Sequence, residues 1–358
     1  MQLCPVRQPC ARHIAASRRT VVVLPLEPVT NVSADHFGEY GIDTLDDLAA
    51  TKLAVARVVD ARGRLVLNAD DPVLVRQAQA LAPAAPIAWF ALDDGHPVLR
   101  AARERGGATC GIADGELWLS RGAARMALGK VVALPLALGG VATYNIANLA
   151  GAALAADGLG IPTGTIAGVL ATFGTASTDN PGRMQRWQLG ATTVLLDYAH
   201  NPEGLAGFLR VATALRGAGR LGLALGQAGN RGDDDIRALA RVAAGFHPGR
   251  IVLKDIDGFL RGRRPGEVPD LLQDELARAG VAADAVGRQL READAARALL
   301  EWVREGDVLA LPIHAAAARD AVVALLDRLQ ASGWMPGRPL PPTDAANGAG
   351  APARNATP

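Results

Sequence analysis

The feature that most constrains the fold is a repeated alternation of short apolar runs with amphipathic segments. Apolar runs of β-type composition occur at residues 21–31, 65–68 and 86–92, and again from residue 192 onward. Such runs are followed by segments with apolar residues at helical spacing, as in residues 44–61. Because strands and helices that alternate along a chain build parallel sheets covered by helices, the sequence predicts an α/β fold.

Two such series follow one another, at about residues 21–180 and 181–334, and they predict two domains. Within the first series, residues 95–140 change to short β-type runs separated by glycine turns, which predicts a small antiparallel sheet. Helices are expected from Asn145 to about Leu159 and directly after it, the latter with Thr163 as its cap.

The two ends of the chain lack this alternation. Residues 1–20 have no convincing periodicity and are interpreted as an atypical N-terminal stub. Residues 335–358 are rich in Pro, Ala, Gly and Asn, and this composition predicts a disordered tail.

Composition and charge exclude several classes of function. The chain has 358 residues and a net charge of +1, so no nucleic-acid partner is expected. No apolar run approaches the roughly 20 residues of a membrane helix, so no membrane partner is expected either. The three cysteines, Cys4, Cys10 and Cys110, are widely spaced, which favours reduced thiols without a disulfide framework or a zinc site. The sequence therefore predicts a cytoplasmic protein.

Polar side chains gather where the predicted strands end. Ligands of open α/β sheets bind beyond the carboxyl ends of the strands, and a single polar strand exit is also typical of an ordinary turn. Six exits of this kind in one chain favour a binding cleft between two domains. They comprise Asn31 to His36, Asn68 to Asp71, Asp197 to Asn201, Gln227 to Asp235, Lys254 to Arg264, and His314.

Three of these exits suggest specific chemistry. In "DYAHNP", Asp197 could accept ribose hydroxyls and Asn201 could donate to a carboxylate or phosphate; the alternative is a capping Asp and an Asn-Pro turn. In "GQAGNRGDDD", glycine-rich backbone near Arg231 could bind an anion, or could form a flexible turn. In "GFLRGRRPGE", Arg261 and Arg263 suit carboxylate or phosphate recognition; a solvated basic loop is the alternative.

Taken in order, five motifs resemble those of the Mur ligases, ATP-dependent amide ligases that include folylpolyglutamate synthase as a relative. The motifs are "TNVSADHFGEYG", "LNADDP", "YNIANLAGAALAA", "NPGRMQ" and "DYAHNP". Two later segments, "RIVLKDIDGFLRGRRPGEVPDLL" and "LPIHAAAARDAVVALL", are similar to the C-terminal half of cyanophycin synthetases. The resemblance extends from about Val21 to Trp334. It implies a truncated P-loop-type central domain followed by a Rossmann-like C-terminal domain.

The resemblance also implies an activity. Enzymes of this family use ATP and Mg²⁺ to activate a carboxylate as an acyl phosphate, which an amine then attacks to form an amide, ADP and phosphate. The partners expected for this chain are therefore an amino acid and a carboxylate-bearing acceptor. In the cyanophycin case the added amino acid is arginine.

Individual residues match family positions. His36 matches a magnesium-ligating histidine, with Asn31 nearby in the same motif. Lys52 matches a lysine that several Mur ligases carry as a carbamate beside the second magnesium ion, and CO₂ addition would turn this cation into an anion suited to Mg²⁺. Without the resemblance, Lys52 would be interpreted as a helix-surface lysine.

Further matches define the nucleotide and substrate sites. Asn145 matches the adenine-contacting asparagine, with Tyr144 in place of the usual histidine before it. Arg183 and Asp197 match the ATP-contacting residues at the domain junction. The candidate substrate-contacting residues are His200, Asn201, Arg231, Arg261 and Arg263.

One part of the family pattern is not present in the sequence. A Mur ligase central domain opens with a glycine-rich phosphate loop ending in Gly-Lys-Thr or Gly-Lys-Ser, but here Lys52, Lys130 and Lys254 precede Leu, Val and Asp. The sequence is therefore interpreted as a truncated central domain. The alternatives to an active ligase are an inactive truncated paralogue that binds nucleotide or amino acid weakly, or an oligomer or partner subunit in which another chain supplies the loop.

Overall fold

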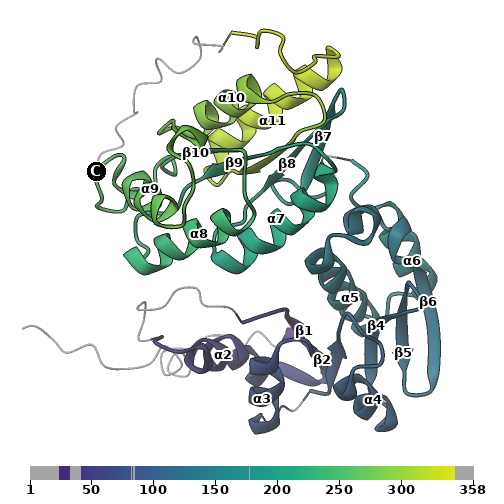
Figure 1. Ribbon diagram of the computed structural model, residues 1–358. Coiled ribbons are helices and arrows are strands. Elements are labelled where there is room, and N and C mark those ends of the chain that lie inside the picture. Colours follow the sequence, from purple (N-terminus) through teal and green to yellow (C-terminus); the bar gives the residue numbers. More distant parts are fainter. Residues whose placement is uncertain (1–23, 33–41, 82, 84, 177, 343–358) are drawn as a thin grey trace, which may run out of the picture.

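The structure is a computed structural model, and it describes residues 24–32, 42–81, 83, 85–176 and 178–342. Two α/β units follow one another, and each is built on a six-stranded sheet. Figure 1 shows the second unit above the first, with the chain crossing from one to the other between α6 and β7. The predicted α/β class with largely parallel sheets is confirmed.

The first sheet has the strand order β1-β2-β3-β4-β5-β6. Its first four strands are parallel, and β4, β5 and β6 form an antiparallel meander at the other end. The predicted antiparallel strands therefore extend the same sheet and do not form a separate one. The strands are β1 (Leu24–Val29), β2 (Val59–Asn68), β3 (Ile87–Phe90), β4 (Ala108–Ala113), β5 (Glu116–Arg121) and β6 (Ala124–Lys130).

Helices cover both faces of this sheet. Alternate residues of β2 explain this, because Val66 packs in the core under α5 whereas Leu65 and Leu67 pack with α2 and α3 on the opposite face. Two helix starts follow the expected chemistry: Thr44 forms a capping box at α2, and Asp71 caps α3. The helices are α2 (Leu45–Leu53), α3 (Pro72–Ala80), α4 (Pro97–Glu104), α5 (Thr143–Gly158) and α6 (Thr163–Thr172).

The second sheet has the strand order β11-β10-β9-β12-β8-β7, and all pairs are parallel except β7 with β8. Helices α7, α8 and α9 cover the face turned toward the first unit, and α10 and α11 cover the other (Figure 1). The strands are β7 (Gln185–Leu189), β8 (Thr192–Asp197), β9 (Leu221–Leu225), β10 (Arg250–Leu253), β11 (Val286–Arg288) and β12 (Val308–Pro312). The helices are α7 (Pro202–Arg216), α8 (Asp233–Gly245), α9 (Glu267–Arg278), α10 (Glu292–Trp302) and α11 (Ala316–Ala331).

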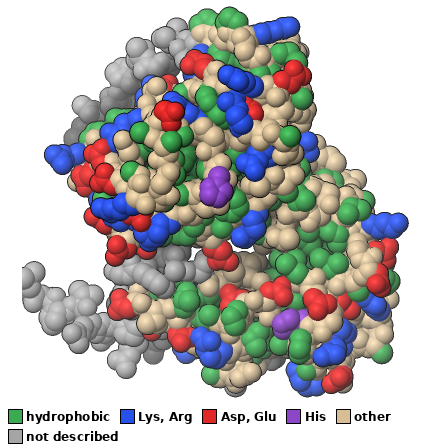
Figure 2. Space-filling model, in the orientation of Figure 1, with side chains coloured by type: hydrophobic (Ala, Val, Ile, Leu, Met, Phe, Trp, Pro, Cys, Tyr) green, Lys and Arg blue, Asp and Glu red, His purple; other side chains and the backbone are tan. Residues whose placement is uncertain are grey.

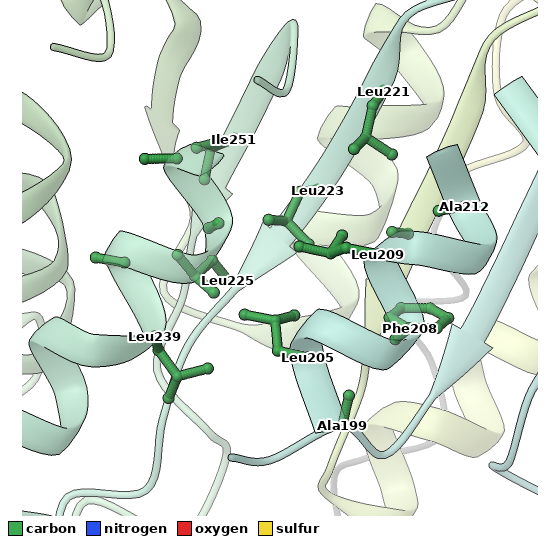
Figure 3. Close-up of a cluster of buried hydrophobic side chains, with 14 of the residues drawn as sticks. Ala199, Leu205, Phe208, Leu209, Ala212, Leu221, Leu223, Leu225, Leu239 and Ile251 are labelled. Atoms are coloured by element: carbon green, nitrogen blue, oxygen red, sulfur yellow. The ribbon is translucent and has the colours of Figure 1, made fainter. Parts of the chain in front are cut away.

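The core of the second unit explains why the sequences of its strands are continuous apolar runs. Figure 3 shows Leu205, Phe208 and Leu209 of α7 packed against the leucines of β9. All five residues of β9 are buried, as expected for a central parallel strand covered on both faces. These strands are parallel, so the carboxyl ends of β8, β9, β10 and β12 lie at one edge of the sheet.

Several predictions of local structure are wrong. The helix predicted for residues 44–61 ends at Leu53, followed by a short 3-10 turn, and Val59 to Ala61 belong to β2. Pairing with β1 draws this segment into the sheet, since Leu24 lies opposite Val59. Thr163 is the first residue of α6 and donates to the Met126 sulfur, so it does not cap the helix.

The predicted tail also needs correction. Residues 335–342 are not disordered: Leu340 packs on the core of the second unit, and Arg297 donates to the Pro341 carbonyl at 2.8 Å. Residues 343–358 and the predicted stub at 1–20 lie outside the described residues. Among the described helices none is long and apolar enough to cross a membrane.

A buried ion cluster ties three elements of the first unit together. Asp157, near the end of α5, accepts from Arg64 of β2 at 2.5 Å and from Nε of Arg121 of β5 at 2.8 Å. The Asp157 side chain is fully buried, whereas Arg121 is 48% exposed. The carboxylate therefore fixes α5 on the sheet, and α5 carries part of the cleft described below.

We expect Asp157→Asn to lower the free energy of unfolding by about 1.5 kcal/mol, because charge-assisted hydrogen bonds to two arginines become weaker neutral ones. Denaturation by urea measures this change. Asp60→Asn is the matched control, because Asp60 pairs with the 93% exposed Arg62, and its substitution should change stability by less than about 0.5 kcal/mol. Equal effects of the two substitutions would contradict the structural role of Asp157.

Candidate functional site

A cleft of about 580 Å³ lies between the two units. Figure 2 shows the surface hollowed there, with acidic and basic side chains around the rim. Strand exits and the start of α5 form one wall, and the loop after β8 with the start of α7 forms the other. The polar lining consists of Thr30, Asn31, Asn68, Asp70, Thr143, Tyr144, Asn145, Asn148, Asn180, Arg183, Asp197, His200, Asn201, Glu203 and Arg210.

Carboxylates fix the wall contributed by the first unit. The Asp71 side chain caps α3 and also accepts from the backbone N–H of Val32 at 2.6 Å, which joins the exits of β1 and β2. The Asp70 side chain accepts from the backbone N–H of Leu92 at 2.7 Å, which joins the exits of β2 and β3. Three neighbouring strand ends are thereby held together, as the sequence predicts for a parallel sheet.

The start of α5 brings two asparagines to the cleft. Asn145 is buried, and its Nδ2 donates to the Leu136 carbonyl at 3.0 Å, which orients the amide. Asn148 is exposed and also lines the cleft. The sequence analysis missed Asn148, although its position three residues after Asn145 places both on one face of a helix.

Tyr144 lies where the two units touch. A Cβ built on Gly207 of α7 would approach the Tyr144 ring to 3.3 Å, so the glycine allows this close contact. The Tyr144 hydroxyl is buried and has no hydrogen-bond partner among the described residues. Burial, with the nearby Asp197 carboxylate, raises the pKa of this phenol, so the hydroxyl remains a donor. A polar ligand group in the cleft would satisfy it.

Asp197 and Arg183 approach the cleft from the second unit. The Asp197 carboxylate accepts from the backbone N–H groups of Met184 at 2.8 Å and Ala199 at 2.9 Å. Burial raises the pKa of Asp197, an effect opposed by these hydrogen bonds and by Arg183. The Arg183 guanidinium lies 4.7 Å from the centre of the Tyr198 ring. Asn145, Arg183 and Asp197, predicted from three separate motifs, therefore line one cleft.

The residues predicted to bind magnesium are only partly described. Lys52 donates to the backbone carbonyl of Asn31 at 3.0 Å, so these two predicted residues lie together. His36, predicted as a metal ligand, lies outside the described residues. Within the described ranges, no group of three or more His, Cys, Asp or Glu side chains could hold a metal ion.

A second pocket of about 200 Å³ lies beside the cleft, within the second unit. His200 lines both cavities, so it belongs to the wall between them. The predicted residues Arg231 and Arg261 line the second pocket only. The lining residues are Tyr198, His200, Gln227, Ala228, Asn230, Arg231, Ile256, Phe259, Arg261 and His314.

Two predicted substrate residues have structural contacts. The Asn201 side chain caps α7 by accepting from the backbone N–H of Gly204 at 2.8 Å. This cap is the alternative that the sequence left open for Asn201. The residue also lines the cleft. Arg263 donates to the carbonyls of Gly229 and Arg231, both at 2.9 Å. It thereby joins the loops that follow β9 and β10, and it is not among the lining residues of the pocket.

A buried charged cluster lies behind the second pocket. Lys254 and Glu292 are both fully buried and form an ion pair of 2.7 Å. Glu292 also accepts from the backbone N–H groups of His314 and Ala315, both at 2.9 Å. Burial, followed by the Lys254 charge, lowers the pKa of His314 to about 4, so the imidazole is neutral near pH 7. The sequence predicted polar residues at Lys254 and His314 but missed Glu292.

The comparisons with known proteins agree with this geometry. The family described as Mur ligase, glutamate ligase domain matches residues 182–312. The cyanophycin synthetase of Synechocystis sp. is 35% identical over 244 residues, which cover 68% of this chain and 27% of that protein. The UDP-N-acetylmuramoyl-L-alanyl-D-glutamate–2,6-diaminopimelate ligase of Chlorobaculum tepidum is 28% identical, over 78% of this chain and 52% of that protein. The chain thus spans about a quarter of the length of the cyanophycin synthetases.

Solved structures show the same fold. The bifunctional folylpolyglutamate synthase/dihydrofolate synthase of Yersinia pestis, complexed with AMPPNP and Mn ion, has a TM-score of 0.59. It is 17% identical, and the match covers 85% of this chain and 62% of that one. The E. coli FolC in complex with ADP has a TM-score of 0.58, covering 87% of this chain and 64% of that one. The predicted resemblance in sequence and fold is therefore confirmed.

Proposed function

We propose that this chain, which carries the C-terminal domain of the Mur ligase family at residues 182–312, is part of an ATP-dependent ligase that joins a carboxylate to an amine. The observation that carries the proposal is the convergence of Asn145, Arg183 and Asp197 on one cleft between the two units. The similarity to cyanophycin synthetases supports an amino acid as the amine.

The cleft residues fit a nucleotide. The Tyr144 hydroxyl is a buried donor without a partner among the described residues, and the Arg183 guanidinium supplies a cation for phosphate oxygens. Asn145 presents an amide whose orientation is already fixed by the Leu136 carbonyl. ATP, when bound, would supply the phosphoryl group that activates the carboxylate of the acceptor.

The chain's own residues would then bring the two reactants together. The second pocket would hold the amino substrate, and the cleft would hold the activated carboxylate. Since His200 lines both cavities, the amine must approach the carboxylate past this side chain. Holding two reactants at one wall converts a bimolecular reaction into an effectively unimolecular one.

Nucleotide binding is tested by calorimetry with ATP on the full chain. We expect Arg183→Gln to weaken ATP binding about tenfold or more, because a charge-assisted contact to phosphate is lost. Arg62→Gln is the control. Arg62 lies in β2, is 93% exposed and does not line the cleft, so its substitution should not alter ATP binding. Absence of ATP binding to the wild-type chain, or equal binding by the Arg183 variant, would contradict the proposal.

A second candidate function is a subunit that binds nucleotide or amino acid without catalysis. The observation that favours it is that no Gly-Lys-Thr or Gly-Lys-Ser sequence occurs within residues 1–358. Release of ADP in the presence of an acid and an amine distinguishes the two functions. ATP binding without ADP release would select the binding subunit.

A further inference from the structure

An aromatic ring contacts the Arg183 guanidinium at the edge of the cleft. The central carbon of this guanidinium lies 4.7 Å from the centre of the Tyr198 ring, within the range of a cation–π contact. Within the described ranges Arg183 forms no salt bridge, and the nearby Asp197 carboxylate accepts from backbone N–H groups. The ring of Tyr198 is therefore the side chain that holds the Arg183 guanidinium.

The kind of contact matters for the binding of an anion. A carboxylate partner would occupy N–H donors of the guanidinium, whereas an aromatic ring attracts the cation and accepts none of its ordinary hydrogen bonds. The donors of Arg183 thus remain available to an anionic group in the cleft, which Arg183 lines. Because a free arginine side chain has many rotamers, orienting it beforehand also lowers the entropy lost when the anion binds.

The backbone next to Arg183 is held by the residue that precedes Tyr198. Met184 adopts φ = 46°, a left-handed conformation that is uncommon for residues other than glycine and that persists where the surrounding structure imposes it. The Met184 N–H donates to the Asp197 carboxylate at 2.8 Å. Two consecutive residues, Asp197 and Tyr198, therefore hold the backbone beside Arg183 and the Arg183 side chain.

The Tyr198 ring is itself held by two histidines. Its centre lies 5.1 Å from the centre of the His200 ring and 5.2 Å from that of His314, the latter in an edge-to-face arrangement. The Nδ1 atom of His314 lies 3.3 Å from Lys254 Nζ and 3.3 Å from Glu292 Oε1, within the buried charged cluster. The ring thus has fixed neighbours in the second unit and can serve as a support for the guanidinium.

From these observations we infer that Tyr198 is a positioning residue for nucleotide binding, because its ring orients the Arg183 guanidinium toward the phosphate groups of ATP. This inference rests on the proposed function, in which Arg183 supplies the cation for phosphate oxygens. Tyr198 lines the second pocket and is not among the lining residues of the cleft. It therefore acts through Arg183 and does not touch the nucleotide itself.

A double-mutant cycle, measured by calorimetric titration of the full chain with ATP, tests this role. We expect Tyr198→Leu to weaken ATP binding about three- to tenfold, because the ring that orients Arg183 is lost. Tyr198→Phe keeps an aromatic ring and should bind ATP within about twofold of wild type. In the Arg183→Gln background, Tyr198→Leu should change the affinity by less than about twofold, because no guanidinium is left to orient.

Two further variants complete the experiment. Tyr198→Met provides a second replacement without a ring, and its flexible side chain fills more of the space than leucine does. Trp118→Leu is the matched control, because Trp118 contacts the Arg125 guanidinium at a comparable 4.0 Å and neither residue lines the cleft. This control should bind ATP within about twofold of wild type.

The possible failures can be told apart. If the wild-type chain binds ATP and Arg183→Gln weakens that binding, equal losses in Tyr198→Leu and Tyr198→Phe would overturn the inference alone. Additive effects of Tyr198→Leu and Arg183→Gln would do the same. If the wild-type chain does not bind ATP, or Arg183→Gln binds it equally well, the proposed function is refuted and the positioning role is refuted with it.

Discussion

Replacing Glu292 with alanine is expected to destabilise the second unit by about 3–5 kcal/mol, the typical cost of breaking a buried ion pair. The side chains of Lys254 and Glu292 are both fully buried, with 0% of their surface exposed to water. Removing the carboxylate leaves the Lys254 ammonium without its counter-ion. Burial lowers the pKa of Lys254, and Glu292 opposes that effect, so the variant must either bury an unpaired charge or release a proton.

The carboxylate has further roles that the variant would lose. It accepts from the backbone N–H groups of His314 and Ala315, which follow the end of β12. Urea denaturation followed by circular dichroism measures the effect. Glu301→Ala is the matched control, because Glu301 is an exposed residue of the same helix and should change stability by less than about 0.5 kcal/mol.

A double variant separates charge burial from lost hydrogen bonds. Lys254→Met combined with Glu292→Gln removes both charges and retains an oxygen that can accept from the backbone. It should recover most of the stability lost in Glu292→Ala, since apolar or neutral replacements of a whole buried pair are often nearly neutral. A double variant as unstable as Glu292→Ala would show that the ion pair itself is required.

Much of the fold could be predicted because local and tertiary preferences agree. Strands such as β9 are buried on both faces and are therefore apolar throughout, and helices such as α7 begin at capping residues. The resemblance supplied the positions of Asn145, Arg183 and Asp197, of which Asp197 lies at the carboxyl end of a parallel strand, where ligands of such sheets bind.

The wrong predictions concern residues whose structure or role depends on partners far away in the sequence. Val59 to Ala61 follow a helical pattern locally but belong to β2, where Val59 pairs with Leu24 of β1. Arg263 was predicted to bind substrate because it lies close to Arg261 in the sequence. Its guanidinium instead donates to the carbonyls of Gly229 and Arg231 and to the carboxylates of Asp233 and Glu267. Glu292 gave no signal because it occupies the first turn of a helix, where an acidic residue is ordinary.

The site and the stability of the second unit depend on the same residues. His314 lines the second pocket, and its Nδ1 atom lies 3.3 Å from Lys254 Nζ and 3.3 Å from Glu292 Oε1. Its Nε2 atom lies 3.4 Å from the Ala199 carbonyl, in the loop that carries His200 between the two cavities. The buried cluster therefore positions the wall at which the two proposed substrates would meet.

Acidification should weaken the second unit through His314. Burial, with the Lys254 charge, lowers the pKa of His314 from 6.5 to about 4, so the folded state binds this proton less readily than the unfolded state. A histidine with a lowered pKa contributes stability that is fully present above the unfolded value of about 6.5. That contribution decreases by up to about 1.4 kcal/mol per pH unit as the pH falls toward the folded value.

We therefore expect the free energy of unfolding to fall by about 2 kcal/mol between pH 6.5 and about pH 5 because of His314 alone. Glu292, whose pKa is lowered because Lys254 and His314 together outweigh the effect of burial, adds a further loss only below its ordinary value of 4.5. Denaturation of the wild-type chain and of His314→Gln at several pH values isolates the histidine. The difference between the two proteins should change steadily across this window, because glutamine does not titrate. A difference that stays constant from about pH 7 to about pH 5 would show that His314 titrates as it does in the unfolded chain.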